Sequence, residues 1–597
     1  MLLNLFILLG LSLLISDSTS VSSEKELIIL HTNDLHSSLQ GSAPESNYTP
    51  LIQDNDGTLG GFARLSTIIQ TEKNKHDNVL ALDGGDFLMG TLFQTLEMET
   101  GFQLKLMYDM GYDAVCIGNH EFDFGIENLS SYLLKASEDS IPALLLSNVT
   151  CSPKLTSDDS FEKIMQDGII KPYYITHTKD FKIGIFGLLG NEAYDVANAH
   201  ELQLENQVKT ARSIVKHLRQ NEEVDIVIAL SHSGVFYDND GEVIRSEDVK
   251  LAHKVDGIDL IISGHTHTII EKPLHINNTY IVQAGDRGKK IGKLRLKVGD
   301  DVSIKDYQLI PVNDDIEGDK IIQNKILKQK ELLTQQTLKS LPYTYDEPLF
   351  HLNFDLNYDN EAPENCNIGS FTADAMHYYS NKYADEYCNI AIIGHGMLRA
   401  SLPKGNVYLP EVFNVASLGS GKDNIPGYPM ARIYLTAREI ERLMGLLIKA
   451  SHQSVNYYMF SSGLQVDYSR KGKDYDKIER IRIQNSEGLF ETVDPSRSNK
   501  QLYSVVADAY MISFLAKIKK MTFGLINIEA KDKDGNTFEN LDRAIIDFDP
   551  NIAGVQEGKI WISLIEYASS FKDEAENLIP EIPYEYEEQA LRLQAIN

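Results

Sequence analysis

Hydrophobic positions in the first half of the chain form short continuous runs, not alternating patterns. Runs rich in Val, Ile and Leu and bounded by Gly or polar residues are typical of strands buried on both faces of a sheet. Such runs lie at 26–30, 79–83, 113–118, 181–190, 225–231 and 259–264. Between them, helical patterns are found at 61–75, 91–110 and 206–221. The alternation predicts an α/β domain over residues 25–312.

The pattern changes after residue 312. A polar stretch at 313–344 carries apolar residues at helical spacing and predicts a linker helix. Residues 345–565 then predict a second, smaller α/β domain, with a helix at 368–382, a strand at 389–394 and a helix at 436–450. The acidic tail at 566–597 is expected to be a surface helix or a loose segment from residue 573 onward.

Length and charge limit the classes of function. A chain of 597 residues exceeds what one hydrophobic core usually supports, which agrees with two domains. The net charge of −30 repels nucleic-acid backbones and anionic membranes, so no nucleic-acid polymer is expected as a partner. An anionic small-molecule substrate would need local positive charge, which bound cations can supply.

The N-terminus predicts export. Residues 2–15 are apolar and are followed by a small polar stretch, which indicates a signal peptide over 1–20 with Ser18 and Ser20 near the cleavage site. The run lacks a preceding Lys or Arg, so a retained N-terminal anchor is the alternative. No second long apolar run follows, so no transmembrane segment is expected after signal removal, and the protein is expected to be secreted or periplasmic. Cys366 and Cys388 lie close enough in sequence to pair in an oxidising compartment. The sequence does not predict the oligomeric state.

Metal-binding residue types directly follow five of the predicted strands. In chain order they are Asp34 and His36; Asp86; Asn119, His120 and Asp123; His232; and His265 and His267. Open α/β sheets place ligands at the carboxyl ends of their strands, so these side chains are expected at one edge. A lone Asp after a strand is usually a helix cap, and a lone His is usually a packed core or surface residue. Five such motifs in one domain favour a site.

The residue types indicate the chemistry of that site. Imidazole together with carboxylate suits Zn, Mn, Fe or Co better than Mg or Ca, with Zn as the first expectation. Seven candidate ligands exceed one tetrahedral shell, so the sequence predicts two divalent ions that share a bridging carboxylate. Two ions about 3.5–4 Å apart can clamp a phosphoryl group and activate water.

The motifs HTNDLH, GGD, GNHEFD, SH and GHTH, in this order, resemble those of calcineurin-like metallophosphoesterases. The GNHEFD form and the second domain narrow the resemblance to the 5'-nucleotidase and UDP-sugar hydrolase family. This resemblance implies a four-layer β-sandwich flanked by helices, joined by a linker helix to the smaller domain. It also implies a two-metal phosphohydrolase that releases nucleoside and phosphate from nucleoside 5'-monophosphates or related nucleotides, with metal-activated hydroxide as the nucleophile.

The resemblance assigns a role to each of these residues. Asp34, His36 and His267 would hold one metal, Asn119, His232 and His265 the other, and Asp86 would bridge them. His120, oriented and kept cationic by Asp123, would be the catalytic residue that steadies charge on the phosphoryl oxygens or the leaving group. Arg64 would support the metal ligands without binding the metals itself, or form only a surface salt bridge.

The second domain departs from the family pattern. Arg399 is retained as a substrate-binding residue, whereas Gly394 stands where the family has Asn, and Leu418-Gly419-Ser420-Gly421 replaces Leu-Pro-Phe-Gly. Tyr510 and Phe523 are candidates for the aromatic ring that contacts the base, although either fits a core position equally well. UDP-sugar or cyclic-nucleotide hydrolysis is the alternative activity. A non-catalytic nucleotide-binding protein is the alternative of another class, and the filled ligand positions argue against it.

Overall fold

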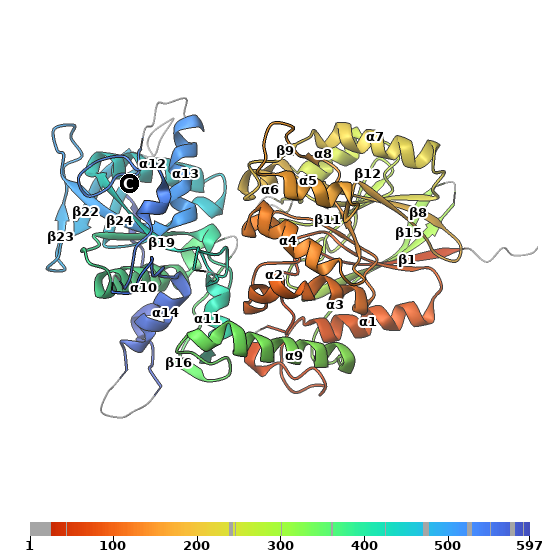
Figure 1. Cartoon of the computed structure of the whole chain (residues 1–597), viewed down its shortest axis with the longest axis horizontal. Coiled ribbons are helices and arrows are strands. Elements are labelled where there is room, and N and C mark those ends of the chain that lie inside the picture. The colour runs from red at the N-terminus through yellow and green to blue at the C-terminus, as the bar shows by residue number, and fades with distance from the viewer. Residues whose placement is uncertain are drawn as a thin grey trace, which may run out of the picture.

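A computed structural model of the chain describes residues 25–596, apart from 43–44, 238–240, 242, 245, 300, 360–361, 424, 470–476, 522–527, 550, 573–578 and 589. The predicted signal peptide and Phe523 lie outside the described residues. The chain forms two lobes joined by one long helix (Figure 1). None of the described helices combines the length and apolarity needed to cross a membrane.

Two mixed sheets packed face to face form the first lobe. The first sheet has the order β15-β14-β1-β2-β3-β4-β6 and the second β12-β13-β11-β10-β8-β7. The first comprises β1 Glu26–Thr32, β2 Val79–Asp83, β3 Ala114–Cys116, β4 Ala143–Leu145, β6 Ile170–Lys171, β14 Lys290–Val298 and β15 Val302–Pro311. The second comprises β7 Tyr173–His177, β8 Lys182–Leu189, β10 Ile226–His232, β11 Leu260–Ser263, β12 Leu274–Ile276 and β13 Thr279–Val282. A short separate pair is formed by β5 Val149–Thr150 and β9 Gln203–Leu204.

Helices cover the outer face of each sheet. Leu27 and Ile29 of β1 pack between the sheets, whereas Ile28 and Leu30 face the helices, as the two-residue period of a strand requires. The first sheet is covered by α1 Phe62–Lys75, α2 Glu97–Thr100, α3 Phe102–Met110, α4 Ile126–Ala136 and α5 Asp159–Gln166. On the other side lie α7 Gln207–Gln220 and α8 Glu247–Lys254, whereas the short helix α6 Asn191–Val196 packs Ala193 into the core on the α4 and α5 side. This four-layer arrangement confirms the predicted fold class.

One predicted helix is broken. The segment expected as a continuous helix over 91–110 is divided into a 3-10 turn at Leu92–Leu96 and the helices α2 and α3. The break falls at Gly101, whose φ of 56° lies in the left-handed region. A Cβ atom there would lie 2.6 Å from the Ala136 Cα in α4, so only glycine fits this position. The helical pattern of the sequence does not report such a packing constraint.

The linker helix α9 Lys320–Gln336 runs along the first lobe (Figure 1). Its N-terminus is capped by the Asp319 carboxylate, which accepts hydrogen bonds from the backbone N–H groups of Ile321 and Ile322. The helix buries Ile322, Ile326 and Leu333 in the same apolar core as α1. This helix is therefore an integral part of the first lobe's surface.

The second lobe contains two four-stranded sheets. The central sheet consists of β19 Met430–Thr436, β24 Leu502–Asp508, β17 Ile390–Gly394 and β20 Met459–Ser462. The outer sheet consists of β23 Phe490–Thr492, β22 Lys477–Gln484, β21 Leu464–Ser469 and β25 Leu593–Ala595. A further pair comprises β16 Pro348–Leu352 and β18 Gly405–Tyr408. The helices are α10 Asn367–Tyr383, α11 Leu409–Val415, α12 Ala437–Ser451, α13 Ala509–Met521 and α14 Ile560–Ser569.

The C-terminal stretch corrects the expectation of a surface helix or loose tail. Strand β25 pairs in parallel with β21, and the Arg592 guanidinium donates to the Asp374 carboxylate at 2.7 Å. The Asn367 side chain also donates to the carbonyl groups of Tyr586 and Glu587, at 2.9 and 3.1 Å. Long-range pairing of this kind leaves no periodic signal in so acidic a segment. The cysteines do not pair: Cys366 and Cys388 are both buried free thiols.

Candidate active site

The candidate ligands lie at the carboxyl ends of the strands, and five of the seven have strained backbones. Asp34, His36, Asp86, His265 and His267 all have φ between 49° and 75°, in the left-handed region that non-glycine residues rarely adopt. Each such residue costs of order 1–3 kcal/mol, which the surrounding structure must offset. Strain of this kind concentrates at functional sites, so the loop conformations themselves mark this edge of the sheets as a site.

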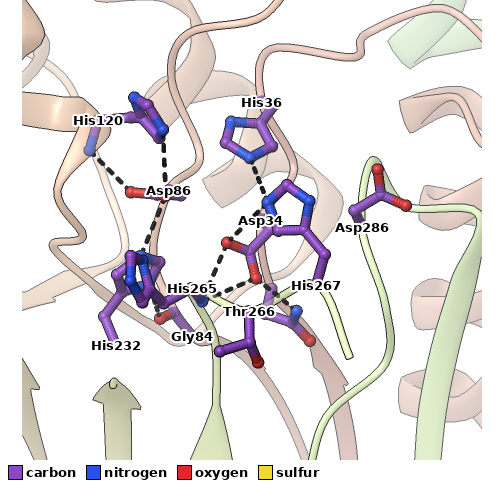
Figure 2. Close-up of polar contacts among 12 residues, drawn as sticks. Asp34, His36, Gly84, Asp86, His120, His232, His265, Thr266, His267 and Asp286 are labelled. Atoms are coloured by element: carbon purple, nitrogen blue, oxygen red, sulfur yellow. Dashed lines mark hydrogen bonds and ion pairs between the residues drawn. The ribbon is translucent and has the colours of Figure 1, made fainter. Parts of the chain in front are cut away.

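The first cluster contains Asp34, His36 and His267 (Figure 2). The Nε2 atoms of the two imidazoles are 3.0 Å apart, and His267 Nε2 is 3.5 Å from Asp34 Oδ1. His36 Nδ1 lies 2.8 Å from the Met89 carbonyl oxygen, which can only accept a hydrogen bond. Nδ1 therefore carries the proton, and the lone pair of Nε2 points into the cluster.

The second cluster contains Asp86, His232 and His265, with Asn119 beside them. His232 Nε2 is 3.0 Å from Asp86 Oδ2 and 3.1 Å from Asn119 Oδ1, and His265 Nδ1 is 2.9 Å from the same amide oxygen. His232 Nδ1 lies 2.9 Å from the Gly84 carbonyl oxygen, so it donates there. The residues predicted from the sequence thus form two adjacent groups, and Asp86 falls with the second.

These groups fit divalent cations. In both clusters potential ligand atoms converge: two Nε2 atoms and a carboxylate in the first, and a carboxylate, an amide oxygen and imidazole nitrogens in the second. Burial lowers the pKa of His265 to about 3 and that of His267 to about 4, so both rings are neutral at pH 7 and have a lone pair to offer. Converging buried acceptors are costly unless a cation lies between them.

His232 has an unusual pKa. Burial alone would lower it, but the Asp86 carboxylate outweighs burial and raises the pKa to about 10. Without a metal, the proton on His232 partly neutralises Asp86. Because metals bind the neutral ring, a cation at this position would replace that proton.

His120 lies beside the second cluster. Its Nδ1 is 2.7 Å from Asp123 Oδ2, and its Nε2 is 3.0 Å from an Nη2 atom of Arg399, which arrives from the second lobe. An arginine can only donate, so His120 Nε2 is the acceptor in this contact. The guanidinium already supplies the positive charge there.

Glu121, which the motif assigned no role, holds two of the loops together. Its fully buried carboxylate accepts from the backbone N–H groups of Gly118, Asp86 and Leu88, at 2.6, 3.2 and 2.9 Å. These bonds link the loop of Asp86 to the loop of Asn119. The only sequence signal was its place between two candidate catalytic residues.

Arg64 forms a buried ion pair, not a surface one. Its contacts among the described residues do not include a candidate ligand. It is fully buried, donates to Asp56 at 2.7 Å and lies over the Tyr48 ring at 4.9 Å. It also donates to the Thr58 carbonyl oxygen at 3.1 Å, which fixes the loop before Gly60. Gly60 packs against the Arg287 carbonyl oxygen, so the support that Arg64 gives reaches the loop of Arg287.

Tyr510 stacks on a tyrosine that the sequence did not single out. The rings of Tyr510 and Tyr428 have centroids 5.1 Å apart and an angle of 15° between their planes. The Tyr510 hydroxyl donates to the Val196 carbonyl oxygen of the first lobe at 2.9 Å. Tyr428 is held beside Leu418, because the Tyr428 N–H donates to the Leu418 carbonyl oxygen at 3.0 Å. In this arrangement no planar group fits between the two rings.

A cavity of about 290 Å³ lies between the lobes. His36 and His267 of the first cluster border it, together with Arg287, Arg399 and Leu418. Neither His120 nor any member of the second cluster is among its lining residues. Arg399, which lines the cavity and contacts His120 Nε2, connects the cavity to the catalytic pair.

Comparisons with known proteins agree with this geometry. Residues 27–268 match the calcineurin-like phosphoesterase family, and residues 344–521 match the 5'-nucleotidase C-terminal domain. The 5'-nucleotidase of Bos taurus is 26% identical over 514 residues, which cover 82% of this chain and 83% of that protein. The trifunctional nucleotide phosphoesterase protein YfkN of Bacillus subtilis is 26% identical over 489 residues, which are 78% of this chain but only 30% of that protein.

Solved structures share the fold. A 5'-nucleotidase precursor from Thermus thermophilus superposes with a TM-score of 0.69 at 19% identity, covering 96% of this chain and all of that one. The fold and the site thus define a calcineurin-like metallophosphoesterase, a metal-dependent phosphoester hydrolase. With both of its domains matched, the chain belongs to the 5'-nucleotidase family.

Proposed function

We propose that this protein is a secreted or periplasmic two-metal phosphohydrolase that releases phosphate from nucleoside 5'-monophosphates or related nucleotides. The observation that carries the proposal is the pair of adjacent clusters in which buried carboxylate, amide and imidazole groups converge. Residues 25–312 would hold the metals, and residues 345–565 would bind the rest of the substrate. Export rests on the apolar N-terminus alone.

The ligands divide between two ions. Asp34, His36 and His267 would hold one ion, and Asn119, His232 and His265 the other, with Asp86 between them as the bridge. Zn suits this set of nitrogen and oxygen donors best, with Mn, Co or Fe as the alternatives. When bound, the ions would polarise the phosphoryl group and activate water for in-line attack on phosphorus.

The residues beside the metals would handle charge and protons. Arg399 Nη2 lies 3.0 Å from His120 Nε2, so a phosphoryl oxygen at this place would meet a guanidinium donor that matches its geometry. His120 Nε2 is the atom that can exchange a proton with the leaving group, because Nδ1 is committed to Asp123. Asp123 would fix the ring orientation and favour the imidazolium once Nε2 is protonated.

Substrate contacts would come from the second lobe. Arg399 and Leu418 line the cavity, and Ser420 stands where the family pattern has an aromatic residue. Burial raises the pKa of Tyr510, and the charge of the nearby Asp123 raises it further. Tyr510 is the proposed aromatic contact, but Tyr428 covers one of its faces.

The test is a panel of nucleoside monophosphates, UDP-sugars and cyclic nucleotides, assayed with and without chelator and with added Zn, Mn or Co. Chelator-sensitive phosphate release from at least one monophosphate is expected. His120→Ala should lower turnover sharply while metal content, measured by elemental analysis, stays at two ions per chain. No metal-dependent release from any compound would refute the proposal, and loss of both metals in the variant would refute the role of His120.

A further inference from the structure

We infer that the cavity beside the first cluster contains a second anion-binding subsite, built from Arg287 and Lys289, and that the preferred substrates are phosphate esters carrying another anionic group. This inference rests on the proposed function and specifies the substrate class of the same site. The additional group would be a carboxylate or a second phosphate close to the ester that is hydrolysed.

Cations are concentrated on the cavity wall of a strongly acidic protein. Arg287, Lys289 and Arg399 all line the cavity, in a chain with a net charge of −30. Of these three, Arg399 is the one that contacts His120, so it is the cation placed for the phosphate that reacts. The other two come from the first lobe and border the space into which the rest of a substrate must extend.

The acidic residues of the wall do not cancel this charge. Asp286 accepts from Lys289 Nζ at 3.0 Å and lies 3.7 Å from Arg287 Nε, so one carboxylate serves two cations. Burial alone would raise the pKa of Asp286, but Lys289, His267 and Arg287 together hold it below its ordinary value. Glu411, the other carboxylate of the wall, accepts from the backbone N–H groups of Ser46 and Tyr408, at 3.0 and 3.1 Å, so the three cations still outnumber the two carboxylates that line the cavity.

The backbone of Arg287 has the same strained conformation as several of the proposed metal ligands. Its φ of 52° lies in the same left-handed region as those of Asp34 and His267. Its N–H donates to the Asp34 carbonyl oxygen at 2.7 Å, and its Nη2 donates to the Arg399 carbonyl oxygen at 2.8 Å. An arginine that is only 9% exposed and held in a strained conformation has a cost, which a binding role would offset.

Two residues of the cavity wall also have a buried polar atom without a hydrogen-bond partner among the described residues. Ser417 Oγ and Arg399 Nε are buried and have no hydrogen-bond partner among the residues described by the structure. Both residues line the cavity. The stacked rings of Tyr428 and Tyr510, in contrast, are not among the lining residues.

The experiment compares matched substrates on matched variants. The pairs are glycerol 3-phosphate with 3-phosphoglycerate, which differ by a carboxylate, and adenosine 5'-monophosphate with 5'-diphosphate, which differ by a phosphate. Lys289→Met removes one cation from the wall, and Lys290→Met makes the same change in net charge at a neighbouring residue that does not line the cavity. Arg287→Met tests the second cation.

The wild type should favour the more anionic member of at least one pair in kcat/KM. Lys289→Met should reduce that preference by about tenfold, the factor expected from loss of one charge-assisted hydrogen bond, and Lys290→Met should keep it. The responding pair identifies the anionic group. Equal kcat/KM within both pairs, or equal effects of the two lysine variants, would overturn the subsite while leaving phosphohydrolysis intact. Absence of turnover on every compound would overturn the proposed function and the subsite with it.

Discussion

His31 is a buried histidine that should make the first lobe sensitive to acid. It lies on β1, fully buried, and its ring stacks on Tyr307 of β15 with centroids 6.1 Å apart. Neither ring nitrogen has a hydrogen-bond partner among the described residues. Gly292, its register partner on β14, makes room for it, because a Cβ there would lie 1.9 Å from His31 Nε2. The ring is therefore accommodated as a neutral, apolar group.

The expected magnitude follows from the pKa. Burial lowers the pKa of His31 from 6.5 to about 3, so the folded state resists protonation while the unfolded state accepts it. Above pH 6.5 neither state is protonated and there is no effect. As the pH falls from 6.5 towards 3, the unfolded state gains a proton and the free energy of unfolding decreases. At pH 5 the decrease is about 2 kcal/mol, from roughly 1.4 kcal/mol per pH unit below 6.5.

The assay is urea unfolding of the wild type and His31→Leu at pH 7.5 and pH 5. Leucine changes packing by an amount that does not depend on pH, so the informative quantity is the change in the difference between the two proteins. The variant should gain about 2 kcal/mol relative to wild type on going to pH 5. The other buried histidines titrate equally in both proteins and cancel. Replacement of the exposed His253 by Asn is the control. The same difference at both pH values would refute the reasoning.

Two other buried groups give distinct predictions. Asp248 accepts from the Ser231 and Ser263 hydroxyls, both at 2.6 Å, directly before His232 and two residues before His265. Asp248→Asn should therefore weaken the second metal by about 10- to 100-fold in titration calorimetry, while the first metal keeps its affinity. Asp259→Asn is the control, because Asp259 accepts from the Val227 N–H at the start of β10, and it should lower stability without changing metal affinity. If Asp248→Asn and Asp259→Asn had the same affinity for the second metal, the role of Asp248 would be refuted. Arg64→Met removes the cation beside Asp56, to which Thr49 and Thr58 still donate, and should cost about 1.5–3 kcal/mol in chemical denaturation, most of which Asp56→Asn in the same chain should restore. No recovery in the double variant would show that packing of Arg64 on Tyr48, not charge, is what stabilises the loop.

Much of the first lobe could be predicted because its information is local. Every predicted strand there was a continuous apolar run, since both faces of its sheet are buried, and each is observed within a few residues of its expected bounds. The candidate ligands follow these strands directly. Because the strands run in parallel, their carboxyl ends lie at the same edge, which was enough to predict that Asp34 and His267 lie close together. The broken helix at Gly101 was missed because the constraint comes from Ala136, far away in sequence.

The second lobe was less predictable because its decisive contacts are long-range. Tyr428 reaches Tyr510 only through the fold of 418–428, which Trp561 anchors by donating to the Pro426 carbonyl oxygen at 2.8 Å. Strand β25 is fixed by Arg592 and Asp374, which are 218 residues apart. Neither arrangement has a period or a motif. Arg287 was missed for a different reason: its residue type is common on surfaces, and only its φ and its place in the cavity single it out.

The strained backbones surround the proposed metal ligands in the first lobe, whereas most of the proposed substrate contacts come from the second lobe. Five of the seven proposed metal ligands have left-handed backbones, and Glu121 and Asp248 hold the ligand loops together from within the first lobe. A change in the second lobe can therefore alter the substrate without disturbing the ligands. Arg287 is the exception, because it shares the strained backbone of the ligand loops and yet faces the cavity and the Arg399 carbonyl oxygen. Through Arg287, charge preference in the substrate is built into the same lobe that holds the metals, so it should persist when residues of the second lobe are exchanged.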